Sequence, residues 1–267
     1  MKSAAIQMCS STDIAENIAV ASTLVREAAA DGAAFIVTPE MTHLLERDPE
    51  ALRANVRKMN NDLGVKTFSS LAAELSINLL IGSLAILRED GKIANRSLLF
   101  APDGTLTAQY DKIHLFEAAL SKSETYREAD SYAAGDTPVT AKVGPLSLGL
   151  SICYDLRFPA LYAKYARAEV DLITAPAAFT VATGKAHWET LLRARAIETG
   201  AYVIAPAQGG HHADGRKTWG RSMIISPWGD AIAILEDDRP GVIFAEIDRA
   251  KVKQARARIP AWRGSSL

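Results

Sequence analysis

Apolar and polar positions along the chain predict strands and helices that interleave. Residues 4–8 alternate with a period of two, which is typical of a half-buried strand. Residues 13–28 then repeat their apolar positions at helical spacing. Asp13, followed by Glu16 three residues later, resembles a capping box at the start of this helix. The apolar run at 34–38 predicts a second, buried strand directly after it.

The middle of the chain predicts helix and then antiparallel strands. Residues 49–76 are mostly helical and amphipathic in pattern, with one interruption near residues 60–61. Residues 77–87 give a strong strand signal, and Asp-Gly pairs mark two tight turns, at 90–91 and 103–104. Three neighbouring antiparallel strands should surround these turns. A structureless loop of about 20 residues is expected from Phe116 to Gly135.

The second half of the chain continues the alternation. Residues 146–153 predict a core strand, a helix follows Pro159, and residues 186–200 predict a helix that Gly200 ends. Further strand candidates are 171–179, 201–208, 221–227, 230–235 and 241–247, and a final basic helix runs over 248–258. The pattern predicts an α/β protein of packed sheets with helices on the outer faces. With no repeat and no linker, residues 1–267 are expected to form one domain.

Composition and charge narrow the functional classes. The 267 residues include 30 Lys and Arg against 31 Asp and Glu, so the basic excess of a typical nucleic-acid-binding protein is missing. Two cysteines cannot form a dense disulfide framework, and a reducing cytoplasm is the default for such a chain. The N-terminus lacks the pattern of a signal peptide, and no apolar run approaches the roughly 20 residues of a membrane helix. We expect a cytoplasmic protein with no nucleic-acid or membrane partner.

Three polar residues occupy the ends of predicted strands. Glu40 follows the strand at 34–38, Lys112 ends the strand after the second Asp-Gly turn, and Cys153 ends the strand at 146–153. Ligands of α/β sheets bind beyond the strand ends, so these side chains could converge there. The combination suits nucleophilic catalysis. A nearby ammonium favours the thiolate, and a carboxylate can accept the thiol proton.

The same groups could stabilise a tetrahedral intermediate. The Lys112 ammonium could donate to the oxyanion, and the backbone N–H of Tyr154 could be a second donor. One such donor typically lowers the barrier by ~3–4 kcal/mol. The carboxylate could then return its proton to the leaving nitrogen and later activate water against a thioester.

Each of these residues also has a simpler, non-catalytic interpretation. A lone cysteine is usually an inert buried residue, as we expect for Cys9, and a glutamate or lysine at a strand end is usually a cap or a solvated charge. A Cys–His pair would use His114, which more simply points to the other face of the sheet or orders its loop. The pair His211-His212 could bind metal, but no accompanying ligand spacing supports it, and a flexible loop near the pocket is the better interpretation. No phosphate loop or dinucleotide fingerprint is present, so we expect no cofactor and no metal. A catalytically silent binding protein is the remaining alternative.

Three sequence blocks resemble the nitrilase, or carbon–nitrogen hydrolase, superfamily over essentially the whole chain: VTPEM at 37–41, YDKIHLF at 110–116 and GLSICYDLRFP at 149–159. The resemblance implies a four-layer α-β-β-α sandwich that dimerises. It implies that Cys153 is the nucleophile, Glu40 the general base and Lys112 the oxyanion-stabilising group. Glu128 matches a second glutamate of the family that orients the lysine, and Glu124 is a weaker match.

The substrate class is also implied by resemblance. Nitrile-hydrolysing members typically carry Trp-Glu where this chain has Tyr154-Asp155, so a small-molecule amide is expected. Blocks at 176–180, 183–198 and 205–212 resemble the branch that acts on deaminated glutathione, with ω-amidase or N-carbamoyl amino acid hydrolase as alternatives. Trp219-Gly220-Arg221-Ser222 departs from the Tyr-Gly-His-Ser usual in that branch. Candidate substrate-binding residues are Arg157, Phe179 and Thr180, with Arg193, Arg195 and Arg221 as further candidates for a distal carboxylate.

Overall fold

The computed structural model describes residues 1–119 and 125–264. The α-helices are α1 (Ile14–Ala30), α2 (Pro49–Asn55), α3 (Leu63–Leu75), α4 (Pro159–Arg167), α5 (Val181–Thr199) and α6 (Arg249–Arg258). The shorter 3₁₀ helices are η1 (Glu128–Asp130), η2 (Cys153–Arg157) and η3 (Pro260–Arg263). Within these described residues, no helix is both long enough and apolar enough to cross a membrane.

The strands form two six-stranded sheets. The first has the order β16-β1-β2-β3-β4-β5 and the second the order β15-β14-β11-β10-β9-β8. The strands of the first sheet are β1 (Lys2–Gln7), β2 (Phe35–Val37), β3 (Asn78–Leu87), β4 (Ile93–Phe100), β5 (Leu106–Asp111) and β16 (Gly241–Glu246). Those of the second are β8 (Thr140–Val143), β9 (Leu146–Leu150), β10 (Leu172–Thr174), β11 (Tyr202–Ala205), β14 (Met223–Ile225) and β15 (Ala231–Ile234). Two small hairpins complete the set: β6 (Glu117–Ala119) with β7 (Thr125–Arg127), and β12 (Gly209–His211) with β13 (Lys217–Trp219).

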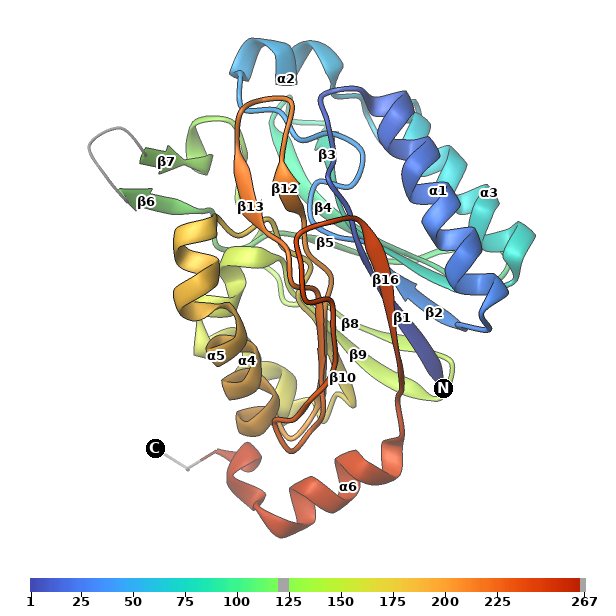
Figure 1. Cartoon of the computed structure of the whole chain (residues 1–267), viewed down its shortest axis with the longest axis vertical. Helices are drawn as coiled ribbons and strands as arrows, with labels where there is room; N and C mark the ends of the chain where they lie inside the picture. Colours follow the sequence, from blue (N-terminus) through green and yellow to red (C-terminus); the bar gives the residue numbers. More distant parts are fainter. Residues whose placement is uncertain (120–124, 265–267) are drawn as a thin grey trace.

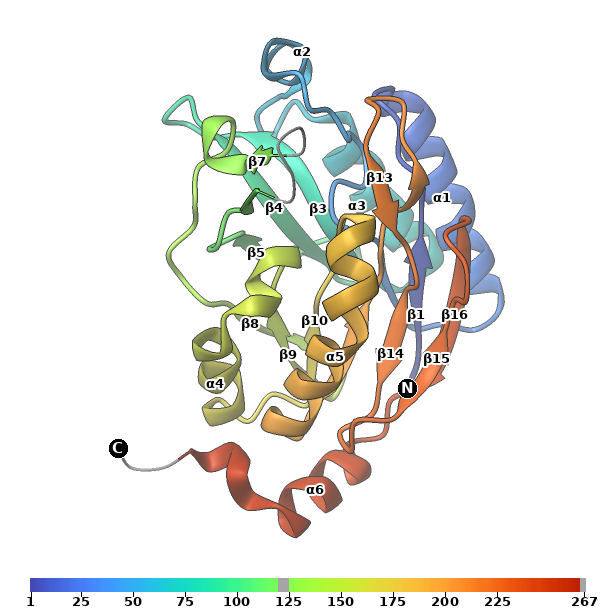
Figure 2. The same ribbon diagram turned by 60° about the vertical axis from the view of Figure 1, so that its left-hand side comes forward.

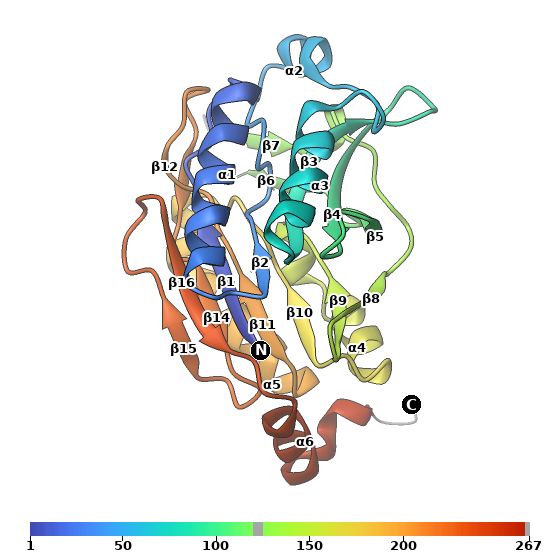
Figure 3. The same ribbon diagram turned by 90° about the vertical axis from the view of Figure 1, so that its right-hand side faces the viewer.

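The two sheets lie face to face with helices on their outer sides. Helices α1 and α3 cover the first sheet, and α4 and α5 cover the second, as the views in Figure 1 and Figure 2 show. Figure 3 looks onto α1 and α3, with the second sheet and α5 behind them. The expected four-layer α-β-β-α sandwich is therefore confirmed.

Alternate residues of the central strands divide between two apolar layers. On β2, Phe35 and Val37 pack in the core between the sheets, whereas Ile36 packs under the helices. On β1, Ala5 belongs to the first layer, and Ile6 to the second. Side chains alternate across a strand, so a strand buried on both faces needs apolar residues throughout. This explains the continuous apolar runs in the sequence. Each fully buried Val, Ile or Phe side chain contributes roughly 1.5–3 kcal/mol.

The sheets approach each other very closely at Gly82 of β3. A Cβ atom here would lie 2.1 Å from the Thr38 carbonyl oxygen and 2.5 Å from the Pro176 Cβ. Only glycine fits such a gap. The segment that follows β2 and the segment that follows β10 therefore meet beside β3.

Several expected elements are confirmed in detail. The Asp13 side chain accepts a hydrogen bond from the Glu16 backbone N–H and caps α1. The region 49–76 forms the two helices α2 and α3 with a break between them. Both Asp-Gly turns join antiparallel strands, β3 to β4 and β4 to β5.

Other expectations were wrong. The segment from Phe116 to Gly135 is not structureless, because it holds the β6–β7 hairpin and η1. The His211-His212 segment is a β-hairpin rather than a flexible loop, and the edge strand β8 was missed. These strands have three or four residues and few apolar positions, so periodicity does not reveal them. Helix α5 begins at Val181 rather than Ala186, because the Thr180 side chain accepts from the Thr183 N–H and caps the helix there. Gly184 in its first turn leaves room for Trp219: a Cβ there would lie 2.3 Å from the Trp219 ring.

Candidate active site

Glu40, Lys112 and Cys153 meet at one end of the sandwich, as the sequence predicts. Glu40 lies three residues beyond β2, Lys112 directly follows β5, and Cys153 begins η2. All three are buried, with 3%, 2% and 6% of their surfaces exposed. Glu128, the fourth predicted residue, joins them from η1. The weaker candidate Glu124 lies outside the described residues.

The Lys112 ammonium is held between two carboxylates. Its Nζ donates to Glu40 Oε1 and to Glu128 Oε2, each at 2.8 Å. The buried side chain of Asn95 connects the same two carboxylates, because its Nδ2 donates to Glu40 Oε1 at 2.9 Å and to Glu128 Oε1 at 3.0 Å. These bonds fix the positions of four side chains relative to one another.

The protonation states follow from these contacts. Burial opposes the charge on Glu40, but Lys112, the Cys153 thiol and Asn95 outweigh it and hold the pKa of Glu40 below its ordinary value. Burial likewise opposes the Lys112 charge, and the two carboxylates outweigh it and raise the pKa of Lys112 well above its usual range. The resting site therefore contains carboxylate and ammonium.

Cys153 rests as a thiol. Burial and the neighbouring Glu40 carboxylate raise the pKa of Cys153 well above its ordinary value, although Lys112 acts in the opposite direction. The expectation that the lysine would favour the thiolate is therefore correct only as one contribution, and it is outweighed. The thiol lies against the Glu40 carboxylate, which is the group placed to accept its proton.

The backbone at Cys153 has a left-handed conformation, with φ of 49°. Strand β9 ends at Leu150 rather than continuing to Cys153 as expected, and the chain turns sharply into η2. The Cys153 N–H donates to the Pro176 carbonyl at 2.8 Å. A non-glycine residue in this region costs roughly 1–2 kcal/mol, which the surrounding contacts must offset.

Asp155 connects the segment that carries Lys112 to the turn that carries Cys153. Its buried carboxylate accepts hydrogen bonds from the Tyr110 hydroxyl at 2.7 Å and from the Ile152 N–H at 2.8 Å. Its other oxygen accepts from the His114 N–H at 3.0 Å and lies 2.7 Å from His114 Nδ1. Tyr110 and His114, each two residues from Lys112 in sequence, are thus both bound to the turn that carries Cys153. His114 orders its loop, as expected.

Two cavities reach Cys153. The narrower one is lined by Arg157, Phe179 and Thr180 together with Cys153 and Tyr154, so these three predicted substrate-binding residues lie at the site. The larger one, of about 190 Å³, contains Glu40, Lys112 and Glu128. Arg193, Arg195 and Arg221 line neither cavity.

Those three arginines bind other parts of the protein. Arg193 pairs with Glu189 and binds the Gly229 carbonyl, Arg195 binds the Leu156 carbonyl and Glu198, and Arg221 pairs with Glu236.

Several residues of the site were missed from the sequence: Asn95, Asp155, and the arginines of the larger cavity, which are Arg47, Arg127 and Arg216. Asn95 could have been recognised from the sequence, since it is a polar residue in the predominantly apolar strand β4, where it is buried. Its carbonyl accepts from the Lys112 N–H at 3.0 Å, which places the two residues side by side. The sequence did not single out these three arginines, because arginine is common on protein surfaces.

The residues considered for other chemistry are engaged elsewhere. The buried His212 ring lies between the Ser10 carbonyl, at 2.8 Å, and the Thr218 hydroxyl, at 2.6 Å. Cys9 is a free, partly buried thiol. In residues 1–119 and 125–264, no group of three or more potential ligands could hold a metal ion.

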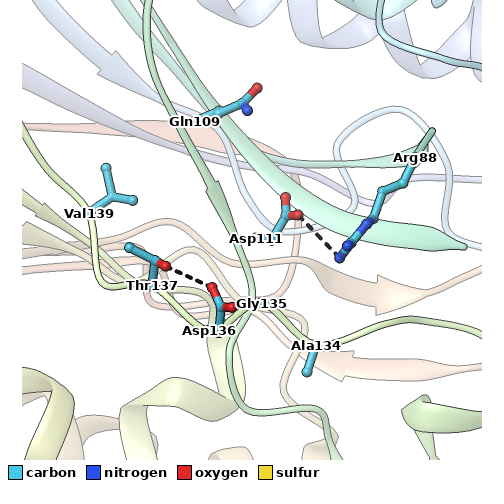
Figure 4. A pocket seen from close by; sticks show the side chains of 8 residues that line it. All are labelled: Arg88, Gln109, Asp111, Ala134, Gly135, Asp136, Thr137 and Val139. Atoms are coloured by element: carbon cyan, nitrogen blue, oxygen red, sulfur yellow. Dashed lines mark hydrogen bonds and ion pairs between the residues drawn. The ribbon is translucent and has the colours of Figure 1, made fainter. Parts of the chain in front are cut away.

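A further cavity of about 230 Å³ lies at the end of β5 (Figure 4). Asp111, the neighbour of Lys112 in sequence, points into it and pairs with Arg88 at 3.8 Å and with Arg96 at 2.6 Å. Asp136 accepts from the Thr137 hydroxyl at its far side. The cavity holds no cysteine or other activated nucleophile, so the chemistry belongs to the cluster around Cys153.

Known proteins share this sequence and fold. The carbon–nitrogen hydrolase family model matches residues 2–257. The chain belongs to the carbon–nitrogen hydrolase family. The resemblance and the expected class of enzyme, one that hydrolyses carbon–nitrogen bonds, are thereby confirmed.

Curated relatives and solved structures agree. A deaminated glutathione amidase of Synechocystis is 40% identical over 97% of this chain and 95% of the relative, and the human protein of the same name is 36% identical over 97% and 80%. The NitFhit protein of C. elegans has a TM-score of 0.91 at 32% identity over 99% of this chain. This chain spans 65% of that longer protein, which is less than two thirds. Nit3 of Saccharomyces cerevisiae, described as a member of branch 10 of the nitrilase superfamily, has a TM-score of 0.86 at 27% identity, covering 97% and 94% of the two chains.

The Asp155 network generates a first prediction. Asp155→Asn replaces an acceptor oxygen with an amide NH₂, so at least one of the groups that donate to Asp155 loses its partner, at a cost of about 1–3 kcal/mol. We expect a lower free energy of unfolding in urea and about tenfold slower alkylation of Cys153 by iodoacetamide, as Lys112 and the turn lose their alignment. Asp171→Asn is the matched control: Asp171 is a buried carboxylate that accepts from the Ser147 N–H and from Arg249, and it does not line either cavity at Cys153. Equal slowing in both variants would contradict the role given to Asp155.

Proposed function

We propose that the protein hydrolyses a small-molecule amide through a thioester on Cys153. The observation that carries this proposal is the buried ammonium of Lys112, 2.8 Å from the carboxylates of both Glu40 and Glu128, beside a buried thiol. A binding protein would gain nothing from burying these charges, since each costs several kcal/mol to desolvate, on the order of magnitude known for buried ions. The family membership of the chain supports the same conclusion.

The first half-reaction forms the thioester. Glu40 takes the proton of the Cys153 thiol as the sulfur attacks the amide carbonyl carbon. The oxyanion accepts hydrogen bonds from Lys112 and from the Tyr154 N–H, since the Cys153 N–H is already donated to Pro176. Glu40 then gives the proton to the leaving nitrogen, and the carbon–nitrogen bond breaks.

The second half-reaction releases the acid. Glu40 removes a proton from water, whose oxygen attacks the thioester carbon, and the collapse of the intermediate returns the proton to the Cys153 sulfur. Glu128 acts by position, because it accepts from Lys112 and from the Phe116 N–H at 2.7 Å. No cofactor or metal takes part in any step.

We propose deaminated glutathione as the amide substrate, hydrolysed to α-ketoglutarate and cysteinylglycine. Relatives at 35–40% identity from cyanobacteria and mammals bear the name deaminated glutathione amidase. In this proposal Arg157, Phe179 and Thr180 bind the 2-oxo acid end, and Arg157 provides the cation for its carboxylate. ω-Amidase activity, which shares this acyl group, is the second candidate, and an N-carbamoyl amino acid is the third.

The mechanism predicts distinct variant phenotypes. Cys153→Ala should abolish amide hydrolysis with the fold intact, and Cys153→Ser should be nearly as inactive, because a serine hydroxyl is much harder to deprotonate than a thiol. Glu40→Gln should prevent acylation, since no base takes the thiol proton, whereas Glu128→Gln should impair turnover and leave Cys153 open to alkylation. Turnover and mass-spectrometric detection of the acyl-enzyme are the measurements. A Cys153→Ala variant with a tenth of wild-type turnover would overturn the assignment, and equal, mild effects of the glutamate variants would misplace the base.

A substrate panel tests the proposed specificity. We expect deaminated glutathione to give the highest kcat/KM, with α-ketoglutaramate next because it shares the acyl group. An N-carbamoyl amino acid, a simple aliphatic amide and an aromatic nitrile should be poor substrates, because they do not offer the 2-oxo acid end to Arg157. Product formation followed by mass spectrometry ranks the five compounds. Fastest turnover of the carbamoyl compound or the nitrile would refute the substrate class.

We also propose that the protein is at least a homodimer, joined through the outer face of α4 and α5. The large side chains of Leu161, Tyr162, Tyr165, Trp188 and Leu192 are buried within the chain. Ile197 on α5 is 56% exposed, and Trp228, next to the Gly229 that Ile197 approaches, is 49% exposed. Light scattering at micromolar concentration should give twice the monomer mass, and Ile197→Glu should reduce it. A wild-type monomer would contradict the proposal.

We also propose a domain organisation and a cellular location for the protein. Residues 1–267 form one carbon–nitrogen hydrolase domain, which the continuous core between the two sheets supports. A cytoplasmic location is supported by the two unpaired cysteines, and recovery of the enzyme outside the cytoplasmic fraction would contradict it.

A further inference from the structure

The larger cavity at Cys153 contains three arginines that the mechanism does not use. Arg47 belongs to the loop before α2, Arg127 to β7, and Arg216 to the hairpin between β12 and β13. These segments are far apart in sequence but gather at the same end of the sandwich (Figure 1). All three line the same cavity as Cys153 and Glu40.

Among residues 1–119 and 125–264, these guanidinium groups retain free donors. Arg216 pairs with Asp214 through its Nε, which leaves its terminal nitrogens available, and its side chain is 23% exposed. Arg127 lies 3.9 Å from Glu117, at the limit of an ion pair. Arg47 has neither a hydrogen bond nor an ion pair to any residue in the described parts of the chain. A guanidinium fork matches a carboxylate in two parallel hydrogen bonds.

The position of Glu40 indicates which half of a substrate occupies this cavity. The group that gives its proton to the leaving nitrogen must lie within hydrogen-bond reach of that nitrogen. Glu40 and Lys112 line the larger cavity, and neither lines the narrower one of Arg157, Phe179 and Thr180. A leaving nitrogen within reach of Glu40 lies in the larger cavity, so the amine half leaves through it.

We propose that Arg47, Arg127 and Arg216 form a subsite for a carboxylate on the amine half of the substrate, such as the C-terminal carboxylate of a released dipeptide. This inference rests on the proposed amide hydrolysis. An extended dipeptide spans roughly 7 Å, at about 3.5 Å per residue, so its carboxylate reaches well beyond Cys153. The cavity of about 190 Å³ provides room in that direction. The enzyme then recognises an anion at each end of the cleaved bond.

Two substrates with the same acyl group isolate this subsite. Deaminated glutathione releases a dipeptide, whereas α-ketoglutaramate releases ammonia. Arg47→Gln and Arg216→Gln should each lower kcat/KM for deaminated glutathione by about tenfold, mainly through KM, and change that for α-ketoglutaramate less than twofold. Arg53→Gln is the matched control: it removes an exposed cation of nearby α2 that does not line the cavity, and it should change neither value.

Product inhibition provides a second measurement that does not depend on cleavage of the larger substrate. Alanylglycine should inhibit hydrolysis of α-ketoglutaramate by the wild-type enzyme, and alanylglycinamide, which lacks the carboxylate, should inhibit at least tenfold less. Arg47→Gln and Arg216→Gln should remove this difference between the two dipeptides.

The outcomes separate the subsite from the function. Suppose that the wild-type enzyme hydrolyses both amides. If the arginine variants then lower kcat/KM for both amides by the same factor, or lower it for neither, the subsite is overturned and the proposed function stands. Wild-type turnover of α-ketoglutaramate alone overturns the subsite as well. If the wild-type enzyme cleaves neither amide, the proposed function fails, and the subsite fails with it.

Discussion

The ion pair of Lys112 with Glu40 and Glu128 is the constraint on which the rest of the site depends. An ammonium 2% exposed to solvent is stable only if the protein replaces the water it has lost. Two carboxylates do so here, and Asn95 donates to both of them, which holds the two carboxylates in place relative to each other. The same bonds set the charge of each group, because they hold Glu40 ionised and Lys112 protonated. Geometry and protonation are therefore fixed by one set of contacts.

The sandwich supplies this set from both sheets. Glu40 and Lys112 follow strands of the first sheet, and Cys153 follows a strand of the second. Contacts between the sheets align them: Glu40 Oε2 accepts from the Ala178 N–H at 2.9 Å, and Gln208 donates to the Glu40 carbonyl at 3.0 Å. The close approach at Gly82 lets these segments meet. Packing of the core and alignment of the reactive groups are thus the same requirement.

Local rules predicted most helices and strands, whereas the four-layer order and the central triad came from the family resemblance. Apolar runs, the cap at Asp13 and the Asp-Gly turns determine elements within a few residues, and the family blocks place Glu40, Lys112 and Cys153 at the ends of strands. Asn95 and Asp155 could not be assigned in this way. Their roles depend on strand register and on side chains 33 to 55 residues away in sequence.

The short hairpins were missed for a related reason. β6, β7, β12 and β13 have three residues each, and tertiary contacts rather than alternation define them. Arg127 and Arg216 belong to these segments, so the wall of the larger cavity was also beyond reach from the sequence. Burial and Glu40 outweigh the effect of Lys112 on the pKa of Cys153. The sequence motif did not predict this, because a motif does not show how deeply a side chain is buried.

The protonated state of Cys153 has a consequence for the durability of the enzyme. Peroxides and other oxidants attack the thiolate rather than the thiol, and the early products lead on to irreversible sulfinic and sulfonic acids. Because burial and Glu40 keep the proton on sulfur, the resting enzyme presents a poor target to such agents. In the mechanism that we propose, the sulfur becomes strongly nucleophilic only while Glu40 withdraws its proton, and by then a bound carbonyl carbon occupies the approach to it. The residue proposed to activate the sulfur would therefore also shelter it between turnovers.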